Sequence, residues 1–315
     1  DPALLRAPTL FQSFQQAGFR VAAVTAKDKL RLLLGAGLIF GSDGAVCCSA
    51  ECADKSTVAT HGIDRLLEKV KRPLPSVYSA ELSEFVFAVG VLLMETKPPD
   101  ILYLSTTDYV QHKHAPGSEC ANQFYAMMDS YWAQFDALGA LIALTADHGM
   151  NAKHTAEGVP DTIFLQSFLD QLFETDRLKV ILPITDPYVV HHGALGSFAT
   201  VYCEQHLCIP AAESMRELPG IEAVLTRAEA CQRFELPADR IGDLVVISGK
   251  HQVIGTSAEQ HDLSGLREPL RSHGGTSEQR VPLILSQSMV GVDTERTFRN
   301  FDLFDIALNH CRNAA

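Results

Sequence analysis

Two side chains that can bind a metal stand next to each other in Asp147-His148-Gly149, at the end of the apolar stretch LIALTADHGM (141–150). An unbroken apolar run of this length predicts a strand covered on both faces, as in a parallel sheet. Sites in such sheets lie at the carboxyl ends of the strands. A carboxylate beside an imidazole can grip one divalent ion, and Gly149 lets the backbone turn away without a steric penalty. An ordinary polar turn explains this stretch equally well on its own.

Further candidate ligands lie next to two other predicted strands, after one and before the other. In ILYLSTTDYVQHKH (101–114), Asp108 and His112 are four residues apart, so a helix after the strand would place both side chains on one face. His273 precedes Gly274-Gly275 and the apolar run VPLIL. Together the candidates are two carboxylates and three imidazoles, which suit zinc or a similar divalent ion. These five ligands are more than one tetrahedral ion needs and fewer than two such ions need.

Two lysines and a histidine pair are candidates for contacting a substrate. Lys27 and Lys29 follow the predicted strand FRVAAVTAK, and residues two apart in an extended chain point the same way, so they could clamp an anion. Solvated surface lysines are the competing interpretation. His192, in His191-His192-Gly193, is a candidate for lining the pocket, with an ordinary turn histidine as the alternative.

The periodicity of the chain predicts a mixed α/β fold. A short helix should begin after Thr9 and stop at Gly18, and a longer one with an aromatic face should follow Ser118. Strands and helices alternate up to Met150, which predicts a three-layer α/β sandwich with a mostly parallel sheet. We expect residues 1–150 and 266–315 to form a metal-binding core, and residues 151–265, rich in short β-like runs, to form an inserted α+β cap.

Composition narrows the classes of partner. The 315 residues carry 26 Lys and Arg against 38 Asp and Glu, a formal net charge of −12 that disfavours nucleic-acid binding. The 8 cysteines form no disulfide framework, which predicts a reducing, cytoplasmic location. The sequence has no apolar run long enough for a membrane span and no signal peptide. We expect a small-molecule substrate and neither nucleic acid nor membrane as partner; a homodimer stays open.

These residues resemble a known superfamily. The stretches that carry the resemblance are TAKDKLRLLLGAGL, KPPDILYLSTTDYVQHKHAPG, ALTADHGMNAKH and RSHGGTSEQRVPLIL. They are similar to the alkaline phosphatase superfamily of metallo-phosphohydrolases, and within it most similar to the phosphonoacetate hydrolases, which cleave a carbon–phosphorus bond. The similarity covers nearly the whole chain, cap included.

The resemblance implies specific roles. It implies one metal site from Asp108, His112 and His273, a second from Asp147 and His148, and two divalent ions, with zinc as the expected metal. Lys27 and Lys29 match the substrate-binding lysines, so the resemblance favours the clamp over solvated surface lysines. The superfamily also supplies an aspartate from its first strand and a threonine nucleophile, which match no segment of this chain. The catalytic nucleophile therefore stays unknown, and we expect these residues alone to be inactive.

The implied reaction is hydrolysis of phosphonoacetate to acetate and phosphate, as a step of phosphonate catabolism. Three alternatives stay open. The chain could be a phosphodiesterase or nucleotide pyrophosphatase of the same superfamily, which needs a nucleoside pocket rather than paired lysines. It could be an inactive metal- or phosphonate-binding protein. A metal-dependent phosphoglycerate mutase is disfavoured, since that family uses a serine nucleophile and a different insertion.

Overall fold

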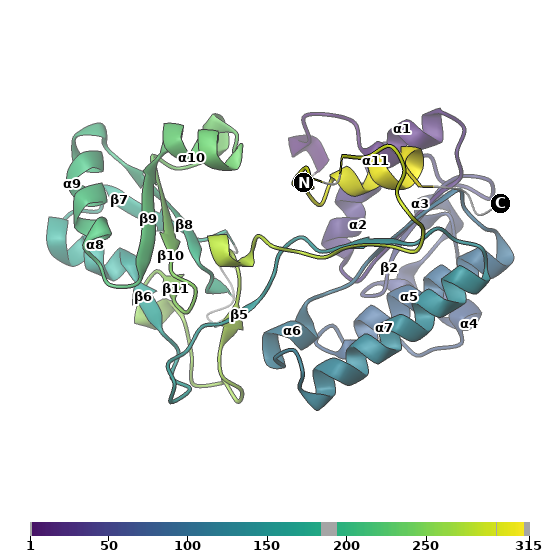
Figure 1. The fold of residues 1–315 in the computed structure, drawn as a ribbon, viewed down its shortest axis with the longest axis horizontal. Helices are drawn as coiled ribbons and strands as arrows, with labels where there is room; N and C mark the ends of the chain where they lie inside the picture. The colour runs from purple at the N-terminus through teal and green to yellow at the C-terminus, as the bar shows by residue number, and fades with distance from the viewer. Residues whose placement is uncertain (1, 184–193, 294, 312–315) are drawn as a thin grey trace. The chain divides into compact units, whose positions relative to one another are not determined.

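The computed structural model describes residues 2–183, 194–293 and 295–311, which divide into two compact units (Figure 1). Unit 1 comprises residues 1–143, 284–297 and 301–315, and unit 2 comprises residues 144–283 and 298–300. These limits differ from the predicted limits of core and cap, and they place Asp147, His148 and His273 in unit 2. The roles of core and cap stay predictions. Among the described residues, no helix has the length and apolar character needed to cross a bilayer.

The centre of unit 1 is a parallel sheet. Its strands, in the order β2-β1-β3, are β1 (Val21–Thr25), β2 (Val46–Ser49) and β3 (Ile101–Ser105). Val24 of β1 lies opposite Cys48 on one side and Leu104 on the other. All five residues of β1 are buried, as expected for an apolar strand covered on both faces.

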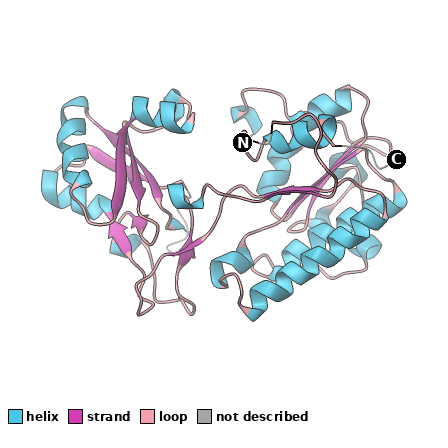
Figure 2. Ribbon diagram, viewed as in Figure 1, coloured by secondary structure: helices cyan, strands magenta, loops and turns pink. Residues whose placement is uncertain are grey.

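Helices cover both faces of this sheet (Figure 2). Phe11 and Phe304 pack with Val21 and Ala23 on one face. Phe85 packs with Ala22 and Val24 on the opposite face. The helices of the first face are α1 (Leu10–Gln16), α2 (Asp28–Leu34) and α11 (Asp302–Asn309). Those of the second face are α4 (Leu66–Val70), α5 (Ala80–Thr96) and, packed against α5, α7 (Glu119–Ala137). The predicted three-layer α/β arrangement is thereby confirmed.

Local signals place several of these helix ends. Thr9 caps α1, since its side chain accepts the backbone N–H of Gln12, and Ser118 caps α7 in the same way. Two short helices, α3 (Val58–His61) and α6 (Tyr109–Lys113), complete the α-helices described in unit 1.

Two pairs of short strands flank the candidate ligands. β4 (Ala143–Thr145) pairs with β13 (Leu283–Leu285), and β5 (Asn151–Ala152) pairs antiparallel with β12 (Arg271–Ser272). The run VPLIL does form a strand, but Ile284 is exposed, so it is not the core strand that its apolar composition indicates.

Unit 2 is built on an antiparallel sheet, which bears out the expected α+β character. Its strands, in the order β7-β8-β10-β9, are β7 (Leu178–Ile181), β8 (Phe198–Cys203), β9 (Ile221–Thr226) and β10 (Leu244–Ser248). β6 (Thr162–Phe164) and β11 (Val253–Gly255) form a separate parallel pair. Helices α8 (Leu165–Phe173) and α9 (Gln205–Arg216) share one apolar core with the sheet, and α10 (Arg227–Phe234) shares another. Short 3₁₀ helices in the described parts of the chain include Pro2–Leu4, Ala53–Lys55, Ala238–Arg240, Ala258–Gln260 and Thr276–Glu278.

Candidate metal centre

In unit 1, Asp108 and His112 come together one helical turn apart. Asp108 is the N-cap residue of α6, directly after β3 and a short polar turn, and His112 lies within the helix. The Asp108 Oδ2 atom is 3.0 Å from His112 Nε2, and both side chains are partly exposed. The turn before them is tied to α5, since the Thr107 backbone N–H donates to the buried Ser83 hydroxyl. The predicted same-face arrangement is present, and its oxygen and nitrogen donors suit a divalent cation.

In unit 2, Asp147 and His148 follow β4, and the hydrogen bonds of His148 select one tautomer. His148 Nδ1 lies 2.9 Å from the Gly149 carbonyl oxygen, which can only accept, so Nδ1 carries the proton. The other ring nitrogen, Nε2, lies 3.7 Å from Asp147 Oδ1. A carbonyl that holds one ring nitrogen is the usual way in which proteins orient a metal-binding histidine.

His273 stacks on His148. The two ring centroids are 3.5 Å apart and the planes differ by 7°. Two imidazolium cations at this separation would repel each other, so the stack favours at least one neutral ring, the form that binds a metal. The His273 carbonyl accepts a backbone N–H from Ser197 at 2.8 Å, and Gly274 follows with φ of +105°, a conformation that glycine tolerates.

The two predicted substrate lysines do not lie in one extended segment. β1 ends at Thr25 and α2 begins at Asp28, so Lys27 precedes the helix and Lys29 belongs to its first turn. The alternation argument for a two-pronged clamp is therefore wrong, because residues two apart in a helix do not face the same way. Lys27 lies over the ring of Tyr78, with Nζ 5.2 Å from the centroid. Binding of one anion by both Lys27 and Lys29 stays a prediction. His192 falls outside the described residues.

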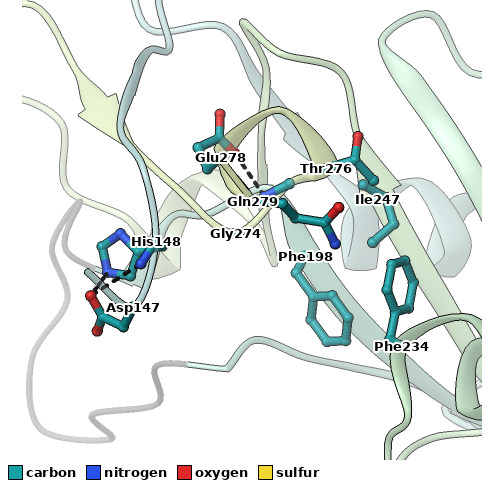
Figure 3. Close-up of a pocket in the computed structure, with 10 residues that line it drawn as sticks. Asp147, His148, Phe198, Phe234, Ile247, Gly274, Thr276, Glu278 and Gln279 are labelled. Atoms are coloured by element: carbon teal, nitrogen blue, oxygen red, sulfur yellow. Dashed lines mark hydrogen bonds and ion pairs between the residues drawn. The ribbon is translucent and has the colours of Figure 1, made fainter. Parts of the chain in front are cut away.

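Asp147 and His148 also line a pocket of about 190 Å³ within unit 2 (Figure 3). Its far wall is apolar and consists of Phe198, Phe234 and Ile247, as Figure 3 shows. These three residues come from β8, α10 and β10, and nothing in the spacing of the sequence connects them.

The pocket further includes Gly274, Gly275, Thr276, Glu278 and Gln279. Glu278 and its buried partner Lys153 were not among the predicted site residues. Each lies five positions after a predicted ligand histidine, but spacing alone does not mark them as partners.

Comparison with known proteins places the chain in a family. The model of the type I phosphodiesterase / nucleotide pyrophosphatase family matches residues 54–276, more than half of the chain. The chain therefore belongs to this family, within the alkaline phosphatase superfamily. Among solved structures, the phosphonoacetate hydrolase of Sinorhizobium meliloti 1021, in complex with phosphonoacetate or phosphonoformate, is 56% identical with a TM-score of 0.92. The match covers 98% of this chain and 75% of that one, which places this chain among the phosphonoacetate hydrolases.

Two further matches are shorter or more distant. A Penicillium oxalicum phosphonoacetate hydrolase is 54% identical over 41 residues, which are 12% of this chain and 57% of the fungal sequence. That match thus spans little more than half of the fungal relative. Murine ectonucleotide pyrophosphatase / phosphodiesterase 5 is 15% identical with a TM-score of 0.52, over 89% of this chain and 63% of that one, a likeness of fold alone.

Proposed function

We propose that this protein is a metal-dependent hydrolase that cleaves the carbon–phosphorus bond of phosphonoacetate. The observation that carries the proposal is the 56% identity, over 98% of the chain, to a phosphonoacetate hydrolase whose structure holds phosphonoacetate. In the reaction water adds a hydroxyl to phosphorus and a proton to the methylene carbon, so that phosphate and acetate leave. The electron pair of the broken bond can spread into the neighbouring carboxylate, which makes the carbon leaving group tolerable.

Two divalent ions would be held by five side chains. In the proposal one ion takes Asp108, His112 and His273, and the second takes Asp147 and His148. The close Asp108–His112 pair and the His148 ring, oriented by the Gly149 carbonyl, support these roles. The stack of His148 on His273 supports adjacent sites. Zinc suits this donor set, and when bound such ions polarise the oxygens of the phosphorus centre and stabilise its developing charge.

Positive side chains would receive the substrate's carboxylate. With a net charge of −12, the overall field repels an anion, so attraction must come from local cations. Lys27 and Lys29 are the proposed contacts, with His192 as a further lining residue. Ammonium groups beside the charge that grows on the leaving acetate stabilise the transition state more than the ground state.

A second candidate function is hydrolysis of a nucleotide phosphodiester or pyrophosphate. The family match over residues 54–276 favours it, as does the apolar wall of Phe198, Phe234 and Ile247, against which a nucleobase could pack. A third outcome, a protein that binds metal and phosphonate without turnover, is decided by the same assay.

The test is a substrate panel in which the products are quantified. The chain, and the full product of its gene, would be loaded with zinc and given phosphonoacetate, an aryl phosphate and a nucleotide diester. We expect equimolar acetate and phosphate from phosphonoacetate by the full gene product, lost on chelation. Lys29→Ala should lower phosphonoacetate turnover at least ten-fold more than aryl phosphate turnover, because a good leaving group needs no carboxylate contact. Preferred release of a nucleotide would contradict the proposal, and equal losses in Lys29→Ala would remove the lysine from it.

The location remains a proposal as well. All 8 cysteines are free thiols, and burial raises the pKa of Cys47 to about 12 and that of Cys48 further, so these two thiols stay protonated. Unpaired thiols support a reducing compartment, and we place the protein in the cytoplasm.

A further inference from the structure

An ion pair lies completely buried between the two turns that carry His148 and His273. Lys153 and Glu278 have side chains that are 0% and 1% exposed, with Nζ 3.1 Å from Oε1. Lys153 belongs to the stretch after His148, and Glu278 to the stretch after His273. All four residues belong to unit 2.

Glu278 is bonded to both turns at once. Its Oε2 atom accepts the backbone N–H of Gly275, two residues after His273, at 2.7 Å (Figure 3). Its backbone carbonyl accepts the N–H of Gly149, the residue directly after His148, at 2.6 Å. That same residue, Gly149, supplies the carbonyl that orients the His148 ring. One glutamate therefore fixes where each turn lies relative to the other.

Lys153 continues the connection on the opposite side. Its ammonium group donates to the Ser197 hydroxyl at 2.6 Å and to the Lys250 carbonyl at 2.8 Å. The Ser197 backbone N–H in turn donates to the carbonyl of His273. The backbone of His273 is thus held from one side through Glu278 and Gly275, and from the other through Lys153 and Ser197.

Filling a core with an ion pair costs more free energy than filling it with apolar side chains. Burying two charges costs desolvation free energy that their attraction seldom recovers in full, and apolar residues of the same volume are often as stabilising. Burial alone would raise the pKa of Glu278, but hydrogen bonds from Asn151 and Ser277 and the charge of Lys153 outweigh it, so its pKa is lowered. The carboxylate is therefore charged at neutral pH. Unlike apolar side chains, the two charged side chains form directional hydrogen bonds, and these reach both turns.

We propose that Glu278, together with Lys153, is a positioning residue that holds the His148 and His273 rings in the geometry that binds a divalent metal. This inference rests on the proposed metal centre. It goes beyond the ligands themselves, because neither Glu278 nor Lys153 needs to touch metal or substrate. Residues that orient metal ligands in this way typically change metal affinity by about 10- to 100-fold when they are replaced.

The test compares Glu278→Asp with wild type in the full chain. Aspartate keeps the charge but withdraws the carboxylate by one methylene, so it cannot reach Gly275 and Lys153 together. Zinc affinity would be measured by competition with a chromogenic chelator, and ligand geometry by the absorption spectrum of the cobalt-loaded protein. We expect zinc binding weakened by at least about ten-fold and a shifted cobalt spectrum.

A carboxylate elsewhere in unit 2 provides the matched control. Asp243 accepts a backbone N–H from Cys203 at 2.9 Å and the guanidinium of Arg227 at 2.6 Å. Asp243→Glu makes the reverse one-methylene change in an ion pair of the same unit, although a partly exposed one, and should leave zinc affinity and the cobalt spectrum unchanged. Loss of affinity in both variants would mean that general destabilisation is the cause, and would overturn the positioning role.

A second variant covers the case in which Glu278→Asp does not fold. Lys153→Met combined with Glu278→Gln removes both charges together, so neither is left buried without its partner. We again expect weaker zinc binding and an altered cobalt spectrum. Wild-type values in either folded variant would overturn the inference alone. Absence of zinc binding by the wild-type protein would instead overturn the metal centre and, with it, this inference.

Discussion

The chemistry of the candidate centre begins with contacts between residues close in sequence. Asp108 and His112 meet because they are one helical turn apart, and the Gly149 carbonyl selects the His148 tautomer because the two residues are adjacent. Asp28, between the two predicted substrate lysines, is held by one contact close in sequence and one from a neighbouring strand. Its carboxylate accepts from Arg31 Nε at 2.5 Å and from the Ser49 hydroxyl at 2.8 Å.

Asp28 yields a prediction about pH. The hydrogen bond from Arg31 outweighs burial and holds the pKa of Asp28 below its usual range. A carboxyl with a lower pKa in the folded state stabilises the fold above its unfolded pKa, and this stabilisation is lost as the pH falls through the folded value. Asp28→Asn should therefore lower the free energy of unfolding by about 1–2 kcal/mol at pH 7. The difference from wild type should shrink as the pH falls below about 4.

Urea unfolding at pH 7 and pH 3 measures this difference. Asp43→Asn is the control, since the Asp43 side chain is fully exposed and lies 3.6 Å from Lys97, so its removal should change little at either pH. A loss in Asp28→Asn that is as large at pH 3 as at pH 7 would show that shape, not charge, is responsible.

Among the elements of unit 1, the ends of helices are as constrained as their packed faces. Gly62 follows α3 with φ of +73°, and a Cβ there would lie 1.9 Å from the Ala45 carbonyl oxygen, which is backbone and cannot move aside easily. Gly139 follows α7 with φ of +81°, and a Cβ there would meet nothing within 4 Å. The two glycines share a conformation and differ only in the space around them.

Replacing each glycine with alanine separates the cost of the left-handed backbone conformation from the cost of the steric clash. Gly139→Ala should lose about 1–2 kcal/mol of unfolding free energy, the cost of a left-handed conformation for a residue with a Cβ. Gly62→Ala should lose that amount plus about 1–3 kcal/mol, because the backbone around Ala45 must shift. Denaturant midpoints measure both. Equal losses would mean that the strand after Ala45 moves without cost.

For the whole molecule, the cores of the two units are distinct. Phe85 belongs to the cluster between α5 and the parallel sheet, and Met215 to the cluster between α9 and the antiparallel sheet. Both side chains are almost completely buried. Chains with separate cores often depart from two-state unfolding.

Calorimetry of the metal-free protein should show this departure. We expect the calorimetric enthalpy to exceed the van't Hoff enthalpy, with two resolvable transitions. Phe85→Ala and Met215→Ala, each worth about 2–5 kcal/mol, should each lower a different transition. A single transition that both variants lower equally would mean that the units unfold as one.

Much of this protein follows from short-range patterns. The cap at Thr9, the buried strand β1 and the Asp108–His112 pair depend on residues within one turn or one strand, so the chain specifies them without its distant parts. The order of strands and helices in unit 1 is readable for the same reason, because apolar periodicity reports which face each element buries. The helix α9 forms although its sequence contains Pro210, which argues against a helix interior, so local signals are a poor guide to it.

What tertiary structure alone decides is which distant side chains meet. Lys153 and Glu278 are 125 residues apart in the sequence and share one buried bond, and His148 stacks on His273 across a similar separation. Lys27 and Lys29 show that residues close in sequence need not act together, because α2 begins between them and the alternation that predicted a clamp fails. Long-range pairing depends on how whole elements pack and on the cost of burying each charge, and neither quantity is encoded in the spacing of residues along the chain.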